Sequence, residues 1–357
     1  MKILYGVQAT GQGHISRARA MSAALCAYPV QVDWLFSGRS RERLFDMEPF
    51  GDFTHRRGLT FNTGGGRIRY LDTVTGNNVP QFLRDVADLD LSSYDIVVTD
   101  FEPVTAWAAR RRGVRSVGIG HQYAFGPRTP TSGGNALTRF IMRQFAPVDV
   151  PIGLHWYPYA DNVLPPILDL PRLEVRSGDH VLVYLPFEDQ AEVTRMLRGF
   201  PEQRFVQYAN GLEQATRDNV TLHPASTVTF KRHLATSNGV ICNSGFELIS
   251  ECLQWRKPVL TKPLAGQLEQ LSNALALEQL GYARAMHTLD PWSIGSWLAH
   301  HRETPACRFR DAATALARWL AQGCRETPGE LAAELWPGMG GTLPPRGVGL
   351  PGAALAG

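Results

Sequence analysis

The 357-residue sequence is poor in cysteine and lysine, and it has no long apolar run. Its five cysteines are odd in number and never in C-x-x-C spacing, which argues against a disulfide framework and against a zinc site. No apolar run approaches the roughly 18 residues that span a bilayer. We therefore expect no transmembrane segment and a reducing, cytoplasmic location, with peripheral binding at the inner membrane face left open.

A strong excess of charge is absent as well, since 36 basic residues stand against 33 acidic ones and the net charge is +3. A mixed surface of this kind gives no reason to expect a nucleic-acid partner. Apolar residues make up 44% of the chain and charged residues 19%, a globular composition. The length exceeds what one hydrophobic core usually fills, so two domains are expected.

Runs rich in valine and isoleucine alternate with helical patterns, which is typical of parallel α/β sheets. The first series of strand-like runs comprises Ile3–Val7, Gln31–Phe36, Asp95–Thr99 and Ser116–Ile119. The second comprises His180–Leu185, Phe205–Tyr208, Gly239–Cys242 and Pro258–Thr261. We expect an α/β fold of two Rossmann-like domains facing each other across a cleft, residues 1–155 and 177–325, with a proline-rich linker at 156–176. Residues 337–357, rich in glycine and proline, are expected to be disordered.

The segment ATGQGHIS, residues 9–16, stands between the first strand-like run and a helical pattern. It is not a P-loop, because His14 follows Gly13 where a lysine is required. It is not a complete dinucleotide fingerprint, because Ser16 replaces the third glycine and Asp33 lies inside a strand-like run. A glycine-flanked histidine remains, at the carboxyl end of a strand. That edge faces the ligand in open α/β sheets.

Polar side chains follow two further strands at the same edge. Asp100 and Glu102 follow one strand, and His121 and Gln122 follow the next. Each of them alone could cap a helix or satisfy a turn. Together, three strand ends bring His14, Asp100 and His121 toward one crevice, and a histidine held by a carboxylate is what a general base needs. These three are the candidate catalytic residues.

Residues 239–281 have the pattern strand, glycine-containing turn, helix, strand, turn and helix. Within them, Gly245 is followed six residues later by Glu251 and then by the pair Glu269-Gln270. This pattern resembles the nucleotide-sugar site of GT-B glycosyltransferases. Two groups match it most closely, the MurG-type enzymes of peptidoglycan synthesis and the plant and bacterial UDP-glycosyltransferases. The loop GQGHIS resembles their GHxxP loop, whose histidine is the catalytic base, and VVTD resembles the strand that ends in its partner aspartate.

The resemblance implies a GT-B fold and a set of donor-binding residues. These are Gly13, Asn243, Ser244, Gly245, Phe246, Glu247, Glu251, Gln267, Glu269 and Gln270. The strand-to-helix turn after Asn243 would hold a diphosphate through backbone N–H groups and the positive helix end, without a metal ion. Glu251 would accept hydrogen bonds from both ribose hydroxyls. Glu269 and Gln270 would face the hydroxyls of the sugar.

Two positions depart from the family pattern. Asn243 stands where the family has a phosphate-contacting His or Arg, and Glu247 stands where the plant enzymes have a phosphate-contacting Asn. A carboxylate at 247 would repel a diphosphate unless it points away or meets a substrate hydroxyl. No aromatic residue matches the one that stacks on the base, although Phe230 or His233 could serve. The identity of the base therefore stays open.

These features predict a glycosyltransferase that needs neither a metal nor another cofactor, with UDP the favoured nucleotide. His14, oriented by Asp100, would deprotonate an acceptor hydroxyl as it attacks the anomeric carbon, and such a direct displacement inverts the configuration. His121 would be a second acid or base, or a contact to the acceptor. The acceptor itself is not indicated: lipid, saccharide, peptide and small molecule are all open. The glycine-rich residues 61–70 could be an acceptor loop or a plain excursion.

Other functional classes stay open. A nucleotide-sugar 2-epimerase would share the fold, and a non-catalytic nucleotide-sugar-binding protein would keep the donor site without using His14. A metal-dependent GT-A enzyme would use the D-x-D letters at residues 88–90, but these precede a strand instead of ending one. A dehydrogenase is disfavoured by the incomplete dinucleotide fingerprint.

Overall fold

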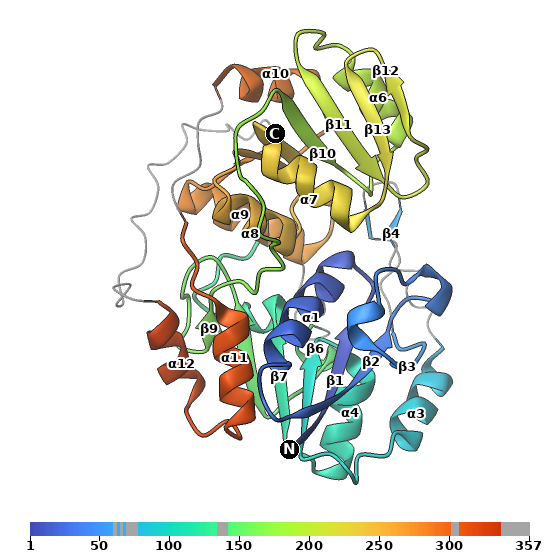
Figure 1. Ribbon diagram of the computed structural model, residues 1–357, viewed down its shortest axis with the longest axis vertical. Coiled ribbons are helices and arrows are strands. Elements are labelled where there is room, and N and C mark those ends of the chain that lie inside the picture. The colour runs from blue at the N-terminus through green and yellow to red at the C-terminus, as the bar shows by residue number, and fades with distance from the viewer. Residues whose placement is uncertain (60–62, 65–66, 69–77, 134–141, 301–306, 337–357) are drawn as a thin grey trace, which may run out of the picture.

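The computed structural model describes residues 1–59, 63–64, 67–68, 78–133, 142–300 and 307–336. Two seven-stranded sheets form the centres of two domains, which lie one above the other in Figure 1. We call the domain around the first sheet the N-terminal domain and the domain around the second sheet the C-terminal domain. The expected tail at 337–357 and most of the glycine-rich segment 61–70 lie outside the described residues.

The first sheet is parallel throughout and has the strand order β3-β2-β1-β6-β7-β8-β9. Its strands are β1 (Lys2–Gln8), β2 (Gln31–Ser37), β3 (Thr54–His55), β6 (Ile96–Asp100), β7 (Ser116–Gly120), β8 (Val150–Leu154) and β9 (Val163–Leu164). The helices of this part are α1 (Gln12–Leu25), α3 (Val79–Asp88) and α4 (Pro103–Arg112), with the 3₁₀ turns η1 (Arg41–Arg43), η2 (Glu48–Phe50) and η3 (His121–Ala124). A separate antiparallel pair is formed by β4 (Thr63–Gly64) and β5 (Arg67–Ile68).

The second sheet has the order β12-β13-β11-β10-β14-β15-β16 and is parallel except for the edge pair β12 and β13. Its strands are β10 (His180–Tyr184), β11 (Arg204–Ala209), β12 (Ala215–Arg217), β13 (Val220–Pro224), β14 (Gly239–Asn243), β15 (Val259–Lys262) and β16 (Arg284–Ala285). Its helices are α6 (Gln190–Leu197), α7 (Thr227–Thr236), α8 (Phe246–Gln254), α9 (Leu268–Leu280) and α10 (Pro291–His300). The predicted pair of parallel α/β sheets is confirmed.

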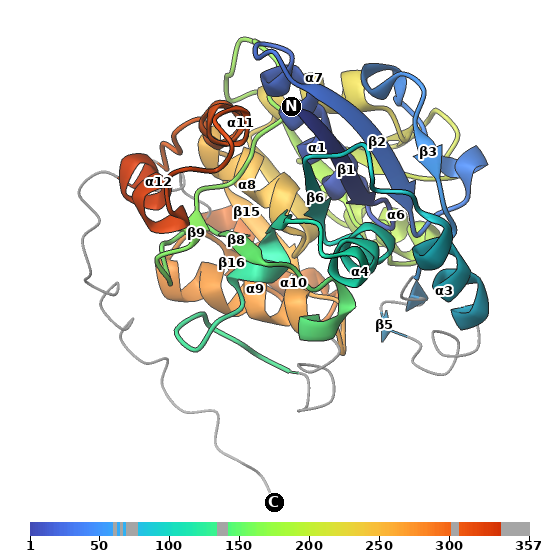
Figure 2. The same cartoon turned by 90° about the horizontal axis from the view of Figure 1, so that it is seen from below.

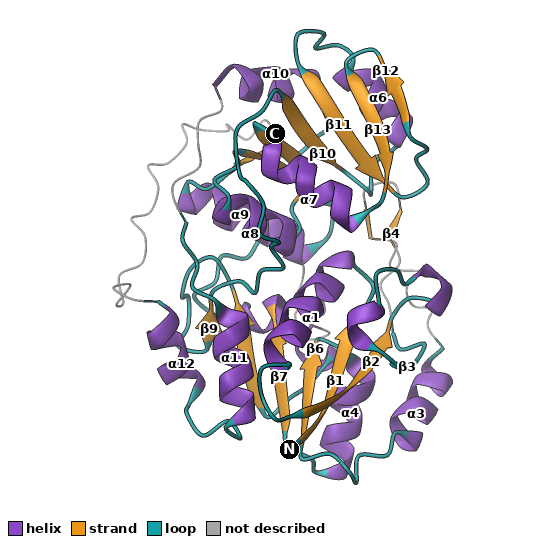
Figure 3. Ribbon diagram, viewed as in Figure 1, coloured by secondary structure: helices purple, strands orange, loops and turns teal. Residues whose placement is uncertain are grey.

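The central strands are buried on both faces, because helices cover each side of the sheet (Figures 2 and 3). In β1, Tyr5 packs in the cluster that contains Ile15 and Met21 of α1. Its neighbour Leu4 points to the other face and packs with Val104 of α4. An apolar strand of this kind is fixed at the centre of the domain, and so is the loop that follows it.

The last described helices, α11 (Ala312–Ala321) and α12 (Pro328–Leu335), return to the N-terminal domain. There α11 packs against α1 and α12 packs against β9, as Figure 1 shows. This differs from the expected boundaries, which placed residues 177–325 in the second domain and residues 156–176, including β9, in a linker. The physical reason is burial: Leu316 and Leu320 of α11 are fully buried in the cluster that also holds Ile15 of α1.

The carboxyl ends of the two sheets point toward each other, as the arrowheads in Figure 1 show. Side chains that follow β1 and β6 in one domain and β14 in the other therefore meet in the space between the domains. Within the described residues, no helix is both long enough and apolar enough to cross a membrane.

Candidate active site between the domains

His14 and Asp100 meet because the strands before them are neighbours. Asp100 ends β6, whose register with β1 pairs it with Val7, and His14 lies in the first turn of α1. Nδ1 of His14 is 2.8 Å from Oδ1 of Asp100. An ionised carboxylate only accepts hydrogen bonds, so Nδ1 carries the proton and Nε2 keeps the lone pair that a general base uses. Asp100 is fully buried, whereas the side chain of His14 is 16% exposed.

Asp100 is also held by Arg17, which the sequence analysis did not single out. Arg17 donates from Nε to Oδ2 of Asp100 at 2.8 Å and from Nη2 to Oδ1 at 2.5 Å. Burial alone would raise the pKa of Asp100, but Arg17 and His14 hold it below its ordinary value. Asp100 is therefore a carboxylate near neutral pH. The signal for Arg17 was its i, i+3 spacing from His14, which places both on one face of α1.

Glu102, which follows the same predicted strand as Asp100, has a structural role. Its carboxylate caps α4 by accepting from the backbone N–H of Val104 at 2.9 Å and of Thr105 at 2.7 Å. It also accepts from the hydroxyl of Ser37 at 2.6 Å. Burial raises the pKa of Glu102. Of these two carboxylates, Asp100 is the one bonded to His14.

The contact network continues into the C-terminal domain. Nη1 of Arg17 donates to Oε1 of Glu247, in the first turn of α8. A Cβ added at Gly13 would lie 2.4 Å from Oε2 of Glu247, so the starts of α1 and α8 approach closely. Both helices follow a glycine, Gly11 or Gly245, that supplies no side-chain cap. Their first N–H groups and positive dipole ends thus lie near the same space between the domains.

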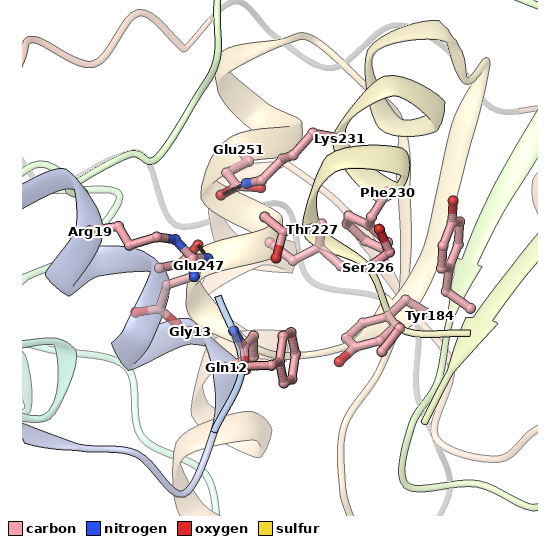
Figure 4. Close-up of a pocket in the computed structure, with 15 residues that line it drawn as sticks. Gln12, Gly13, Arg19, Tyr184, Ser226, Thr227, Phe230, Lys231, Glu247 and Glu251 are labelled. Atoms are coloured by element: carbon pink, nitrogen blue, oxygen red, sulfur yellow. Dashed lines mark hydrogen bonds and ion pairs between the residues drawn. The ribbon is translucent and has the colours of Figure 1, made fainter. Parts of the chain in front are cut away.

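A pocket opens beside this contact (Figure 4). Its lining comes from α1, α7 and α8 and from the ends of β10 and β11. Four aromatic residues contribute to it, Phe45, Tyr184, Tyr208 and Phe230, and so do Glu247 and Glu251 of α8. Flat rings can stack on aromatic side chains of this kind. Phe230, one of the two aromatic candidates in the sequence, thus lines the pocket.

Glu251 lies in this pocket as an ion pair with Lys231 of α7. The side chain is buried, and burial raises the pKa of Glu251 above its ordinary value although Lys231 opposes the shift. Lys231 is a second pocket residue that the sequence analysis missed. His233, the other aromatic candidate, is 2.7 Å from the hydroxyl of Tyr208 through Nδ1.

His121 and Phe246 lie in a buried contact between the domains. Nδ1 of His121 is 2.8 Å from the carbonyl oxygen of Leu154, and Nε2 is 2.7 Å from Oδ1 of Asn273 on α9. The His121 ring stacks on Phe246 with centroids 4.0 Å apart and an angle of 7° between the planes. Neither residue lines the pocket that contains Glu251.

Asn243 and Ser244 lie at the carboxyl end of β14 and are held by β15. Nδ2 of Asn243 donates to the carbonyl of Lys262 at 3.0 Å, and Oγ of Ser244 is 2.8 Å from Oγ1 of Thr261. Oδ1 of Asn243 is buried without a hydrogen-bond partner. One acceptor is thus left unsatisfied at the edge of the sheet that faces the N-terminal domain.

Three predicted donor-binding residues lie at the start of α9. Gln267 is its N-cap residue, and Gln270 accepts from the backbone N–H of Leu264 at 2.9 Å. Glu269 accepts from Nε2 of Gln122 at 3.0 Å, which joins the two domains. None of the three lines the pocket. Among the residues that the structure describes, no group of three or more His, Cys, Asp or Glu side chains is placed to hold a metal ion.

Comparison with known proteins identifies the architecture. A family profile described as glycosyl transferase family 1 matches residues 1–301. No curated protein sequence matches the chain. The glycotransferase of kitacinnamycin is 14% identical, with a TM-score of 0.56 and coverage of 93% of this chain and 97% of its own.

Two further solved structures give the same result. SsfS6 from Streptomyces sp. SF2575, a glycosyltransferase, is 14% identical with a TM-score of 0.56, covering 94% of this chain and 99% of its own. The spinosyn rhamnosyltransferase SpnG, complexed with thymidine diphosphate, is 12% identical with a TM-score of 0.55 and the same coverage, 94% and 99%. At these identities the likeness shows the fold alone, which confirms the two-domain GT-B arrangement.

Proposed function

The chain belongs to glycosyl transferase family 1, and on that premise we propose that it moves a sugar from a nucleoside-diphosphate sugar to an acceptor hydroxyl, without a metal ion and with inversion. That it is a glycosyltransferase follows from the family. The donor, the stereochemistry and the metal independence are the proposal. The observation that carries it is the 2.8 Å contact between His14 and Asp100 beside the interdomain pocket.

The base step uses Nε2 of His14. This nitrogen takes the proton of the acceptor hydroxyl while the hydroxyl oxygen bonds to the anomeric carbon and the bond from that carbon to the diphosphate breaks. Asp100 stays ionised and stabilises the imidazolium that forms. Because the acceptor attacks opposite the leaving diphosphate, the anomeric configuration inverts.

The leaving diphosphate would be stabilised by the amino end of α8, after Gly245. This helix start has no side-chain cap, so its backbone N–H groups can donate to phosphate oxygens. Donors placed where negative charge develops contribute a few kcal/mol to such a step, about 2.7–4 for one oxyanion donor. The uncapped start of α1 lies next to it and adds a second positive helix end. In this proposal the helix ends take the place of a metal ion.

The nucleoside would occupy the aromatic pocket. Tyr184, Tyr208 and Phe230 supply rings for a base, and Glu251 with Lys231 supplies an acceptor and a donor for the ribose. A carboxylate that accepts from both ribose hydroxyls favours UDP over dTDP, which lacks the 2′-hydroxyl. The complex of SpnG with thymidine diphosphate supports a pyrimidine nucleoside diphosphate in this fold.

The acceptor would bind in the N-terminal domain near His14. SpnG has also been solved with spinosyn aglycone, which supports testing hydroxyl-bearing aglycones first, before lipids, saccharides and peptides. We place the enzyme in the reducing cytoplasm, because all five cysteines are unpaired.

The test begins with thermal shift of the protein against UDP-, dTDP- and GDP-sugars, because a ligand that binds only the folded state raises the apparent stability. Release of nucleoside diphosphate is then followed with acceptor mixtures, with and without EDTA, and the product configuration is read by NMR. His14→Ala should lower turnover by roughly 10²–10⁴-fold without weakening nucleotide binding, and His300→Ala, at an exposed histidine of α10, is the matched control. Full activity of H14A, or conversion of the donor without an acceptor, would contradict the proposal.

A further inference from the structure

Arg17 is a buried cation shared by two domains. Its side chain is 1% exposed, and its guanidinium meets Asp100 through Nε and Nη2 and Glu247 through Nη1. Asp100 and Arg17 belong to the N-terminal domain, whereas Glu247 begins α8 of the C-terminal domain. Figure 4 shows Glu247 beside Gly13, where α8 approaches the start of α1.

Arg17 has both of its carboxylate partners only when the domains are together. Burial alone would lower the pKa of Arg17, but the two carboxylates raise it above its ordinary value. The Asp100 contact lies within one domain and persists if the domains separate. The Glu247 contact does not, because its two partners move with different domains.

The guanidinium is also close to the base itself. Nη2 of Arg17 lies 3.0 Å from Nδ1 of His14, and both nitrogens share Oδ1 of Asp100 as their acceptor. A planar guanidinium has donors in fixed directions. A partner for Nη1 on one side therefore sets the plane in which Nη2 and Nε meet Asp100, and with it the position of the oxygen that orients His14.

We propose that Arg17 is a positioning residue that couples docking of the C-terminal domain, through Glu247, to the alignment of Asp100 and His14. Glu247 then acts on the base instead of on the donor. The inference rests on the proposed function, because it concerns the same base. It also gives Glu247 a cationic partner, Arg17, which lessens the expected repulsion between this carboxylate and a diphosphate.

The first experiment uses Glu247→Gln, which removes the charge and keeps the shape of the side chain. We expect kcat to fall by roughly 10- to 100-fold, the scale of a small misplacement of catalytic groups, while the Kd of UDP changes by less than about twofold. Asp169→Asn is the matched control, because Asp169 pairs at 3.1 Å with the neighbouring Arg19 of α1 and does not touch Asp100. It should leave kcat unchanged.

The second experiment combines Glu247→Gln with Arg17→Lys. If Glu247 acts through Arg17, the double variant should have the kcat of the worse single variant, because residues in one chain of contacts are not additive. Losses that multiply would overturn the proposal. If R17K does not fold, the test rests on the single variant E247Q. Any result for E247Q other than a lower kcat with unaltered UDP affinity would then overturn the proposal.

His14→Ala separates this inference from the proposed function. An active H14A would remove the base and with it the proposed function. An inactive H14A together with independent effects of Arg17 and Glu247 would leave the function standing and refute only the coupling.

Discussion

Replacing Asp100 by asparagine tests the centre of the site. The carboxylate accepts from His14 at 2.8 Å and from Arg17 at 2.8 and 2.5 Å. An amide keeps one oxygen but turns an NH₂ group toward another donor, and Arg17 is left with Glu247 as its remaining carboxylate partner. Breaking a buried ion pair by removing one partner destabilises by roughly 3–5 kcal/mol, and each kcal/mol shifts the Tm of a domain of this size by about 2–4 °C. We expect a fall in Tm of roughly 6–20 °C.

The same substitution should lower kcat by about 10⁴-fold, as in other His-carboxylate pairs in which asparagine favours the wrong tautomer. The assays are scanning calorimetry and steady-state release of nucleoside diphosphate. Asp95→Asn is the control, because Asp95 directly precedes β6 whereas Asp100 ends it. The Asp95 carboxylate accepts from the exposed backbone N–H of Lys2 at 2.7 Å. D95N should change stability by about 1 kcal/mol or less.

The pH dependence of this difference has a defined sign. Because the pKa of Asp100 is lower in the folded protein than in the unfolded chain, its contribution to stability is complete above about pH 4 and is lost as the pH falls through the folded-state pKa. The gap in Tm between wild type and D100N should therefore be constant from roughly pH 8 to pH 5 and narrow below about pH 4. A D100N protein with unchanged Tm would refute the buried-pair reasoning, and one with lowered Tm but normal kcat would refute the role of Asp100 in catalysis.

Glu251→Gln should weaken UDP binding by about 10-fold or more, because hydrogen bonds to charged groups contribute roughly 1.5–3 kcal/mol. The loss should be smaller for dTDP, and calorimetric titrations that give equal losses would argue against the ribose contact. Gly13→Ala places a Cβ against Oε2 of Glu247. It should therefore reproduce the loss of kcat of E247Q with normal UDP affinity. A fully active variant would show that the Glu247 side chain moves aside without affecting the base. Burial, with neighbouring histidines, lowers the pKa of His233 from 6.5 to about 4. The free energy of unfolding should therefore fall as the pH drops between these values, and the Tm of His233→Gln should fall less than that of the wild type over the same range. Equal falls in Tm would show that the pKa of His233 is the same in the folded and unfolded states.

The central strands could be predicted because their sequences are apolar on both faces. Each of the strand-like runs that were recognised by their valine and isoleucine content corresponds to a strand, namely β1, β2, β6, β7, β10, β11, β14 and β15. Among the strands that were missed, β8 contains Pro151 and Gly153, which weaken strand propensity, although it lies inside the first sheet. The edge strands β9 and β16 have two residues each, too few for any periodicity.

The site could be predicted only as far as strand ends determine it. His14 and Asp100 meet because β1 and β6 are neighbours in register. The contact of Arg17 with Glu247 depends on how two domains dock, which no local pattern encodes. His121 was placed correctly at a strand end, but packing against Phe246 sends its ring into the domain contact. The roles assigned to the donor-binding residues stay predictions.

The return of α11 and α12 to the first sheet means that the polypeptide passes between its two halves twice. A single covalent connection allows one half to twist as well as bend, whereas two separate connections restrict rotation to an axis that runs close to both. The path of the backbone itself thus limits how the two halves can move apart.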